Sequence, residues 1–118
     1  MSSEDVCEVV ITAPAGPWLH DFVRHLVEDR LCASGHVAPM HSTYRWKGVI
    51  HDAAEDRAAL HTRADLLPEI IERALAEHPY EVPCVVAVPI VGGSPSYLQW
   101  IRDKTRSPSI SHSPAGGP

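Results

Sequence analysis

The sequence lacks any apolar run near the roughly 18 residues that a membrane-spanning helix needs. Its first residues, 1–5, carry neither a basic nor an apolar segment, so no secretory signal is expected. Positive charge is also scarce, since ten Lys and Arg stand against fifteen Asp and Glu for a formal charge of −5. No basic stripe is available to displace counterions from phosphates, and no polybasic patch is available for an anionic membrane. We therefore expect a soluble protein with neither nucleic-acid nor membrane partners.

Cysteine is scarce as well, and the common catalytic motifs are missing. Cys7, Cys32 and Cys84 are an odd number without a CxxC pair, which argues against a disulfide framework and favours the reducing cytoplasm. Walker A, GxGxxG, GxSxG and HExxH motifs are absent from the chain. No nucleophile with an activating base is apparent. The sequence thus predicts a cytoplasmic binding protein rather than an enzyme.

Hydrophobic periodicity predicts alternating strands and helices. Asp65 is expected to be the N-cap of the second helix, and Ser34-Gly35 to be the stop signal of the first. The expected elements are strand 7–13, helix 18–33, extended arms 36–46 and 49–61, helix 66–77, strand 84–90 and helix 96–105.

The two extended arms meet at Lys47-Gly48, a pair typical of a two-residue hairpin turn of type I′. By propensity alone, residues 53–59 could also form a helix. We interpret them as strand, because the first arm of the hairpin needs a partner.

The order β-α-β-β-α-β with a C-terminal helix is typical of an α+β, ferredoxin-like antiparallel sheet. Helices would cover one face of this sheet, and the chain has no spare layer for the other. We therefore expect oligomerisation through the open face or the long ribbon. The folded domain should span residues 1–105, followed by a tail over 106–118 that is rich in Ser, Pro and Gly.

The hairpin register places several potential metal ligands on one face of the ribbon. If Lys47 and Gly48 form the turn, opposed residue numbers sum to 95, and His36 and His61 become diagonal neighbours. Imidazole, thioether and carboxylate groups suit copper or zinc. The alternative is that these histidines only form hydrogen bonds at a polar interface. The ribbon face would carry His36, Met40, His51, Glu55 and His61.

The turn His78-Pro79-Tyr80-Glu81-Val82-Pro83 joins the second helix to an apolar strand. Proline ends the helix at His78, whose ring is expected to cap the last carbonyls. The turn is either a site or a plain connector, and physical reasoning from the residues favours the connector. Cys84, which opens the strand, is a candidate soft ligand, whereas Cys7 and Cys32 are expected in the core.

Several motifs together resemble one known family, the CutA divalent-cation tolerance proteins. The resemblance covers residues 9–105. It rests on Leu26-Val27-Glu28-Asp29-Arg30-Leu31, Tyr44-Arg45-Trp46-Lys47-Gly48, Glu55, Thr62, the turn from His78 to Pro83, and Tyr97-Leu98-Gln99-Trp100-Ile101.

The resemblance implies a tight homotrimer of ferredoxin-like subunits that binds copper(II) or another divalent metal, with no metal required for folding. The alternative is a trimeric signalling or scaffold protein that binds a small metabolite or a partner protein in clefts between subunits. Candidate metal ligands are His36, His61, Cys84 and Glu55. Candidate cleft residues are Arg30, Tyr44, Trp46, Lys47, His78, Tyr80 and Trp100.

Three positions depart from the pattern of this family. Ser34 stands where many members have Cys, His61 where Lys is usual, and Cys84 where Glu is usual. Either the metal chemistry is rebuilt around His36, His61 and Cys84, or it is lost while the trimer persists.

Overall fold

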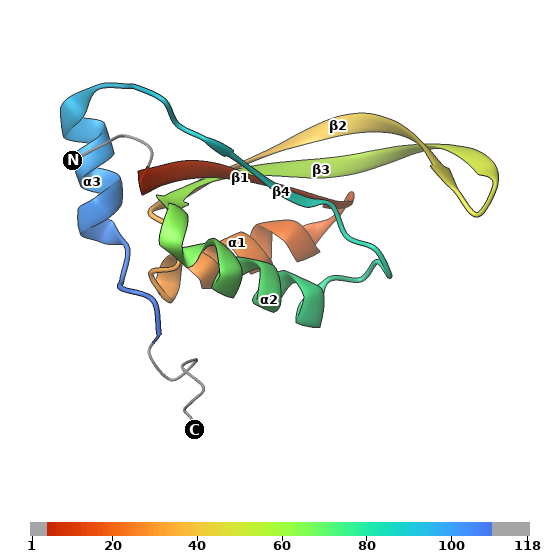
Figure 1. Ribbon diagram of the computed structural model, residues 1–118. Helices are drawn as coiled ribbons and strands as arrows, with labels where there is room; N and C mark the ends of the chain where they lie inside the picture. The colour runs from red at the N-terminus through yellow and green to blue at the C-terminus, as the bar shows by residue number, and fades with distance from the viewer. Residues whose placement is uncertain (1–4, 110–118) are drawn as a thin grey trace.

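The computed structural model describes residues 5–109 and confirms the α+β architecture (Figure 1). A single 3-10 turn, Ala64–Leu66, precedes the second helix. The elements are β1 (Val6–Pro14), α1 (Pro17–Glu28), β2 (Ser34–Trp46), β3 (Val49–Arg63), α2 (Leu67–Glu77), β4 (Val85–Pro89) and α3 (Pro95–Lys104).

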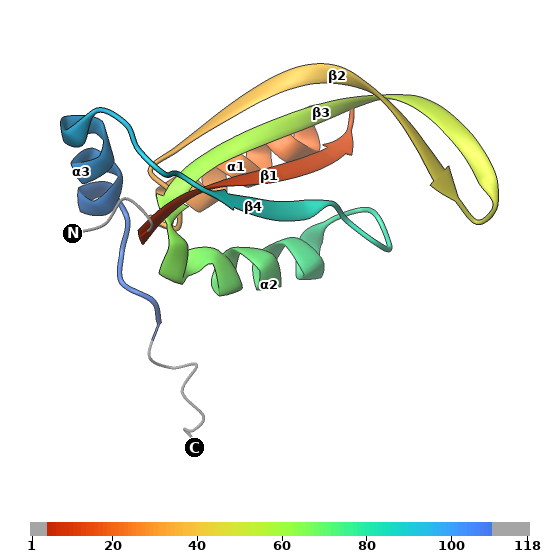
Figure 2. The same ribbon diagram turned by 45° about the horizontal axis from the view of Figure 1, so that its top comes forward.

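The strands form one antiparallel sheet in the order β2-β3-β1-β4, which is the ferredoxin-like arrangement. Helices α1 and α2 lie side by side under one face, and the β2–β3 ribbon extends well beyond them (Figures 1 and 2). Helix α3 covers only one end of the other face, where Leu98 and Ile101 pack with Val6 and Ala33.

The predicted register of the ribbon is confirmed. Trp46 pairs with Val49 and Ser34 pairs with His61, so the numbers of opposed residues sum to 95 along the whole ribbon. Lys47 (φ 51°) and Gly48 (φ 81°) both have positive φ, as a type I′ turn requires. Residues 53–59 are strand despite their helical propensity, because pairing with both β1 and β2 outweighs it.

The first helix ends at Glu28, so the prediction that it continues to residue 33 is wrong. Arg30 adopts the left-handed conformation (φ 61°), and two hydrogen bonds close the end of the helix: Arg30 N–H donates to Val27 at 3.0 Å, and Leu31 N–H to Leu26 at 2.9 Å. This is a Schellman motif with arginine where glycine is usual, and the absence of glycine concealed it in the sequence.

Gly35 does not stop the helix but lets α1 approach the sheet. A Cβ at this position would overlap Val23 Cγ1 of α1 and would lie 2.9 Å from Leu60 Cδ2 of β3. Gly35 therefore belongs to β2, which begins two residues before the predicted start at His36.

Asp65 is not a helix cap, contrary to the prediction. The N-cap position of α2 is Leu66, and no side chain caps it. Asp65 lies within the 3-10 turn, where its carboxylate accepts a hydrogen bond of 2.6 Å from Arg63. Cys84 also lies one residue outside β4.

The first residues of the predicted tail are held against the helices. Arg106 N–H donates to the Arg30 carbonyl at 2.9 Å, and its guanidinium contacts Glu69 at 2.6 Å. Ser109 N–H donates to the same carboxylate at 2.7 Å. Residues 110–118 of the predicted tail lie outside the described residues, and the domain boundary stays a prediction.

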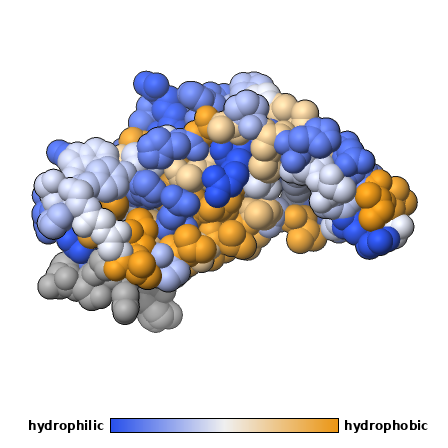
Figure 3. Space-filling model, turned by 90° about the horizontal axis from the view of Figure 1, so that it is seen from above, coloured by the Kyte–Doolittle hydropathy of each residue, from blue (hydrophilic) through white to orange (hydrophobic). Residues whose placement is uncertain are grey.

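The sheet face opposite α1 and α2 exposes apolar side chains. Val86 and Val88 of β4 are 54% and 49% exposed. Hydrophobic residues gather along one side of this face and at the ribbon tip (Figure 3). Among residues 5–109, no helix is long and apolar enough to cross a membrane.

Candidate functional site

The two predicted ligand histidines meet on the open face of the sheet. His36 on β2 and His61 on β3 have ring centroids 5.4 Å apart, with 62° between the ring planes. This confirms that they are diagonal neighbours, because the ribbon keeps its register from the turn to its base. His36 is exposed, whereas the side chain of His61 is only 18% exposed.

Both ring nitrogens of His61 have hydrogen-bond partners. Nε2 lies 2.9 Å from the Glu8 carboxylate, and Nδ1 lies 2.6 Å from the Tyr97 hydroxyl. A carboxylate only accepts, so in the neutral ring Nε2–H donates to Glu8 and Nδ1 accepts from Tyr97. Tyr97 in turn accepts from Ser34 at 3.3 Å. We call Glu8, His36, His61 and Tyr97 the histidine cluster.

Glu8 and Tyr97 were missed as site residues in the sequence analysis. Glu8 faces His61 only because β1 pairs with β3. These two strands are not consecutive in the chain, so no hairpin turn sets their register. Tyr97 lies 36 residues from His61 and reaches it because α3 packs over the end of the sheet. Its place in the Tyr97-Leu98-Gln99-Trp100-Ile101 motif was the only signal available.

The four predicted metal ligands do not form one group. Within residues 5–109, no three His, Cys, Asp or Glu side chains are placed to hold a metal ion together. Glu55 lies six positions before His61 on extended β3, which is a distance of about 20 Å. Glu55 and Cys84 instead line a separate pocket.

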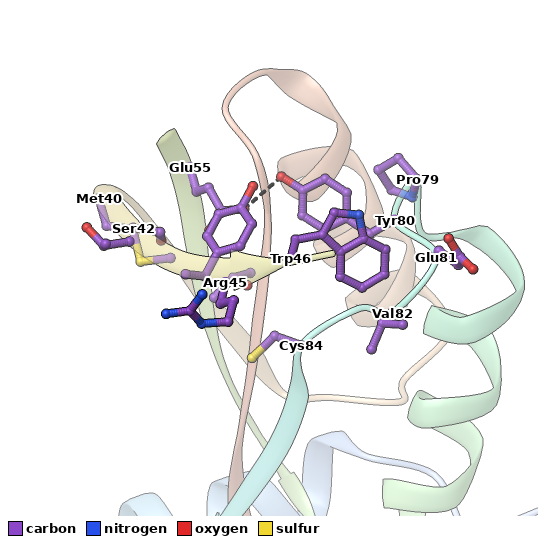
Figure 4. Close-up of a pocket in the computed structure, with 13 residues that line it drawn as sticks. Met40, Ser42, Arg45, Trp46, Glu55, Pro79, Tyr80, Glu81, Val82 and Cys84 are labelled. Atoms are coloured by element: carbon purple, nitrogen blue, oxygen red, sulfur yellow. Dashed lines mark hydrogen bonds between the residues drawn. The ribbon is translucent and has the colours of Figure 1, made fainter. Parts of the chain in front are cut away.

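This pocket lies where the ribbon bends over the turn that precedes β4 (Figure 4). Its volume is about 640 Å³. Three aromatic side chains line it, Tyr44 and Trp46 from β2 and Tyr80 from the turn, together with the carboxylate of Glu55. We call it the aromatic pocket. The turn from His78 to Pro83 supplies part of the pocket wall, through Pro79, Tyr80, Glu81 and Val82.

Glu55 and Tyr80 form the most buried polar pair of the pocket. Glu55 is 5% exposed, and the Tyr80 hydroxyl donates to its Oε2 at 2.7 Å. Burial, the hydrogen bond to Glu55 and the negative charge of its carboxylate together raise the pKa of Tyr80 to about 12, with burial as the largest cause. The phenol thus remains a hydrogen-bond donor across the physiological range.

His78 does not cap α2 with its ring, contrary to the prediction. Its Nδ1 accepts from the Tyr80 backbone N–H at 3.0 Å, so in the neutral ring Nε2–H donates to the Thr12 carbonyl at 2.7 Å. The ring ties the turn to β1. His78 is 9% exposed and positions Tyr80 rather than lining the pocket.

The remaining predicted cleft residues lie in three different places. Arg30 donates from its guanidinium to the Asp103 carbonyl at 3.2 Å, at the end of α1. Lys47 is at the tip of the ribbon, with Nζ 5.5 Å from the Trp46 ring centre. Trp100 stacks on Tyr97 at 5.5 Å, next to the histidine cluster. Within one chain they form no common cleft.

The model of the CutA1 divalent ion tolerance protein family matches residues 7–104. The divalent-cation tolerance protein CutA of Thermus thermophilus is 38% identical over 98 residues, covering 82% of this chain and 95% of the relative. Human protein CutA is 36% identical over 107 residues, covering 90% of this chain. The chain spans 60% of the length of the human relative and of the chloroplastic CutA of Arabidopsis thaliana.

Solved structures of the family share the fold. CutA1 from Oryza sativa superposes with a TM-score of 0.84 at 32% identity, covering 87% of this chain and 95% of that one. The Thermus thermophilus protein gives 0.82 at 36% identity, covering 86% and 99%. On the match to the family model, these identities and the shared fold, the chain belongs to the CutA1 divalent ion tolerance family.

Proposed function

We propose that this protein contributes to tolerance of divalent cations by binding them, with copper(II) as the favoured ion, at the histidine cluster. The observation that carries the proposal is the 2.6 Å contact between His61 Nδ1 and the Tyr97 hydroxyl, with Glu8 behind the same imidazole. The ligands would be His61, Tyr97 and His36.

His61 has the hydrogen-bonding pattern of a metal-binding histidine. Such histidines usually donate their second ring N–H to a carboxylate, which fixes the tautomer and makes the free nitrogen a better ligand. Glu8 is in this position. Two ligand atoms at about 2.0 Å from a metal and at right angles are about 2.8 Å apart, close to the separation of His61 Nδ1 and the Tyr97 oxygen.

The metal would replace the phenol proton of Tyr97, and so proton release accompanies binding. Imidazole must be neutral to ligate, and therefore affinity should fall steeply below about pH 6. His36, at 5.4 Å from the His61 ring, is close enough to swing toward the same ion. Glu55, about 20 Å away along β3, and Cys84, which lines the aromatic pocket, are not part of this site.

We also propose that the protein is a homotrimer and acts by binding rather than by catalysis. The exposed Val86 and Val88 on the open face support self-association, because exposed apolar side chains beside a polar cluster are typical of interfaces. A neighbouring subunit could complete the coordination of a metal held by only three ligands. We propose a cytoplasmic location as well, although named relatives include chloroplastic and periplasmic proteins.

To test the metal site, copper(II) is titrated into the full chain, and binding is monitored by calorimetry and by visible absorption. We expect a saturable site with a phenolate-to-copper charge-transfer band. His61→Ala should lose binding at least about tenfold, and Tyr97→Phe should lose the band. His20→Ala, on the exposed surface of α1, is the matched histidine control. Binding that is equal in wild type, His61→Ala and Tyr97→Phe would overturn the proposal.

A second function, binding of a small molecule, is favoured by the aromatic pocket. The buried Glu55 carboxylate in the lining argues against an anionic metabolite as the ligand of this pocket.

A further inference from the structure

We propose that the aromatic pocket binds a primary organic ammonium ion attached to an apolar ring or chain, with Glu55 as its counter-ion. The site lies about 20 Å along β3 from the histidine cluster. The proposal therefore does not depend on metal binding, and either can fail without the other.

The first argument is the incomplete pairing of Glu55. Glu55 is only 5% exposed, and Tyr80 donates one hydrogen bond to its carboxylate. Of the residues that the structure describes, no lysine, arginine or histidine forms an ion pair with it. A buried carboxylate is costly unless it is paired and hydrogen-bonded. An ammonium group entering the pocket would supply the missing pair.

The second argument is the aromatic wall. Tyr44, Trp46 and Tyr80 line the same pocket as Glu55, and ring faces attract cations. The chain itself provides an example: the ammonium of Lys47 lies 5.5 Å from the centre of the Trp46 ring. Lys47 is at the exposed ribbon tip, 4.0 Å from Glu81, and is outside the pocket lining. The interior remains available to a ligand.

The third argument is the overall charge and size of the lining. Two carboxylates, Glu55 and Glu81, stand against one guanidinium, Arg45. The hydroxyls of Thr12 and Ser42 can accept further hydrogen bonds from an ammonium group. A volume of about 640 Å³ holds a ring or a short chain beside the charged group. A bare metal ion would leave most of this apolar space unfilled.

Three probes of one shape but different charge test the proposal: benzylammonium, benzyl alcohol and benzoate. Each is titrated at neutral pH into the whole chain of residues 1–118, and binding is monitored by amide NMR shifts. We expect benzylammonium to bind at least about tenfold more tightly than benzyl alcohol, and benzoate to be the weakest, since a hydrogen bond to a charged partner is worth about this factor. The shifts should map to residues around Glu55 and Tyr80.

Glu55→Gln should bring the affinities for benzylammonium and benzyl alcohol together. Glu72→Gln on the exposed surface of α2 makes the same charge change outside the pocket and should retain the preference. If Glu55→Gln does not fold, Trp46→Leu serves instead, because Trp46 is 36% exposed, and it should weaken benzylammonium more than benzyl alcohol. The proposal is overturned by equal binding of the three probes, by a preference for benzoate, by the absence of saturable binding, or by a preference that survives Glu55→Gln.

Discussion

The Tyr80 hydroxyl donates a hydrogen bond of 2.7 Å to the buried carboxylate of Glu55, and this contact joins the turn before β4 to the middle of the long ribbon. The two residues are 25 positions apart in sequence. Their contact shapes the aromatic pocket and keeps the phenol protonated, because burial and the carboxylate together raise the pKa of Tyr80 to about 12.

Alkaline pH should destabilise the fold through Tyr80. In the unfolded chain this phenol ionises near its ordinary pKa of 10.0, whereas the folded protein holds its proton up to about 12. The unfolded state therefore binds fewer protons between these values, and the free energy of unfolding falls as pH rises through this window. Tyr80→Phe should show a smaller decline between about pH 9 and about pH 11, measured by urea unfolding. Equal declines in both proteins would contradict this assignment.

Gly35→Ala should lower the free energy of unfolding by about 1–3 kcal/mol, because the added methyl overlaps Val23 where α1 lies against β2. Gly92→Ala is the matched control, since a Cβ there meets nothing within 4 Å, and it should change stability by less than about 0.5 kcal/mol. Chemical denaturation of both variants measures the difference. Equal stability would mean that α1 is not held this close to the sheet.

Arg30 should act as a structural residue at the end of α1. Arg30→Ala removes the hydrogen bond to the Asp103 carbonyl and keeps a residue with a Cβ at φ 61°. Arg30→Gly loses the same bond but adopts this conformation freely, so it should be more stable than Arg30→Ala by about 0.5–1 kcal/mol. Thermal unfolding of the two variants gives the order. The reverse order would exclude the Schellman motif.

The three thiols should react at very different rates. Cys84 is exposed beside the aromatic pocket, whereas Cys7 and Cys32 are buried. Burial raises the pKa of both buried thiols, to about 12 for Cys32, and so little thiolate is available there. An aromatic disulfide reagent should therefore modify one thiol rapidly in the native protein and all three after unfolding. Cys84→Ser should remove the rapid phase, and rapid loss of a second thiol would show that the core opens.

Much of the fold could be predicted because it depends on local chemistry. Lys47-Gly48 sets the type I′ turn, and the turn sets the register of the ribbon, which brings His36 beside His61. The end of α1 could not be predicted in this way. Arg30 is a poor left-handed residue by propensity, and contacts that form only in the folded chain hold it there: Leu31 packs into the core, and Arg106 N–H donates to the Arg30 carbonyl.

The same distinction between local and long-range contacts applies to the candidate sites. The sequence by itself determined the order of strands and helices, the ribbon register and the placement of His36 beside His61, since turns and alternation act between neighbours in the chain. The tertiary structure alone decided that Glu8 and Tyr97 surround His61, and that Glu55 lies with Tyr80 in a separate pocket. These contacts join residues 25 to 53 positions apart, and they exist only after the sheet has assembled and both α3 and the turn have packed against it.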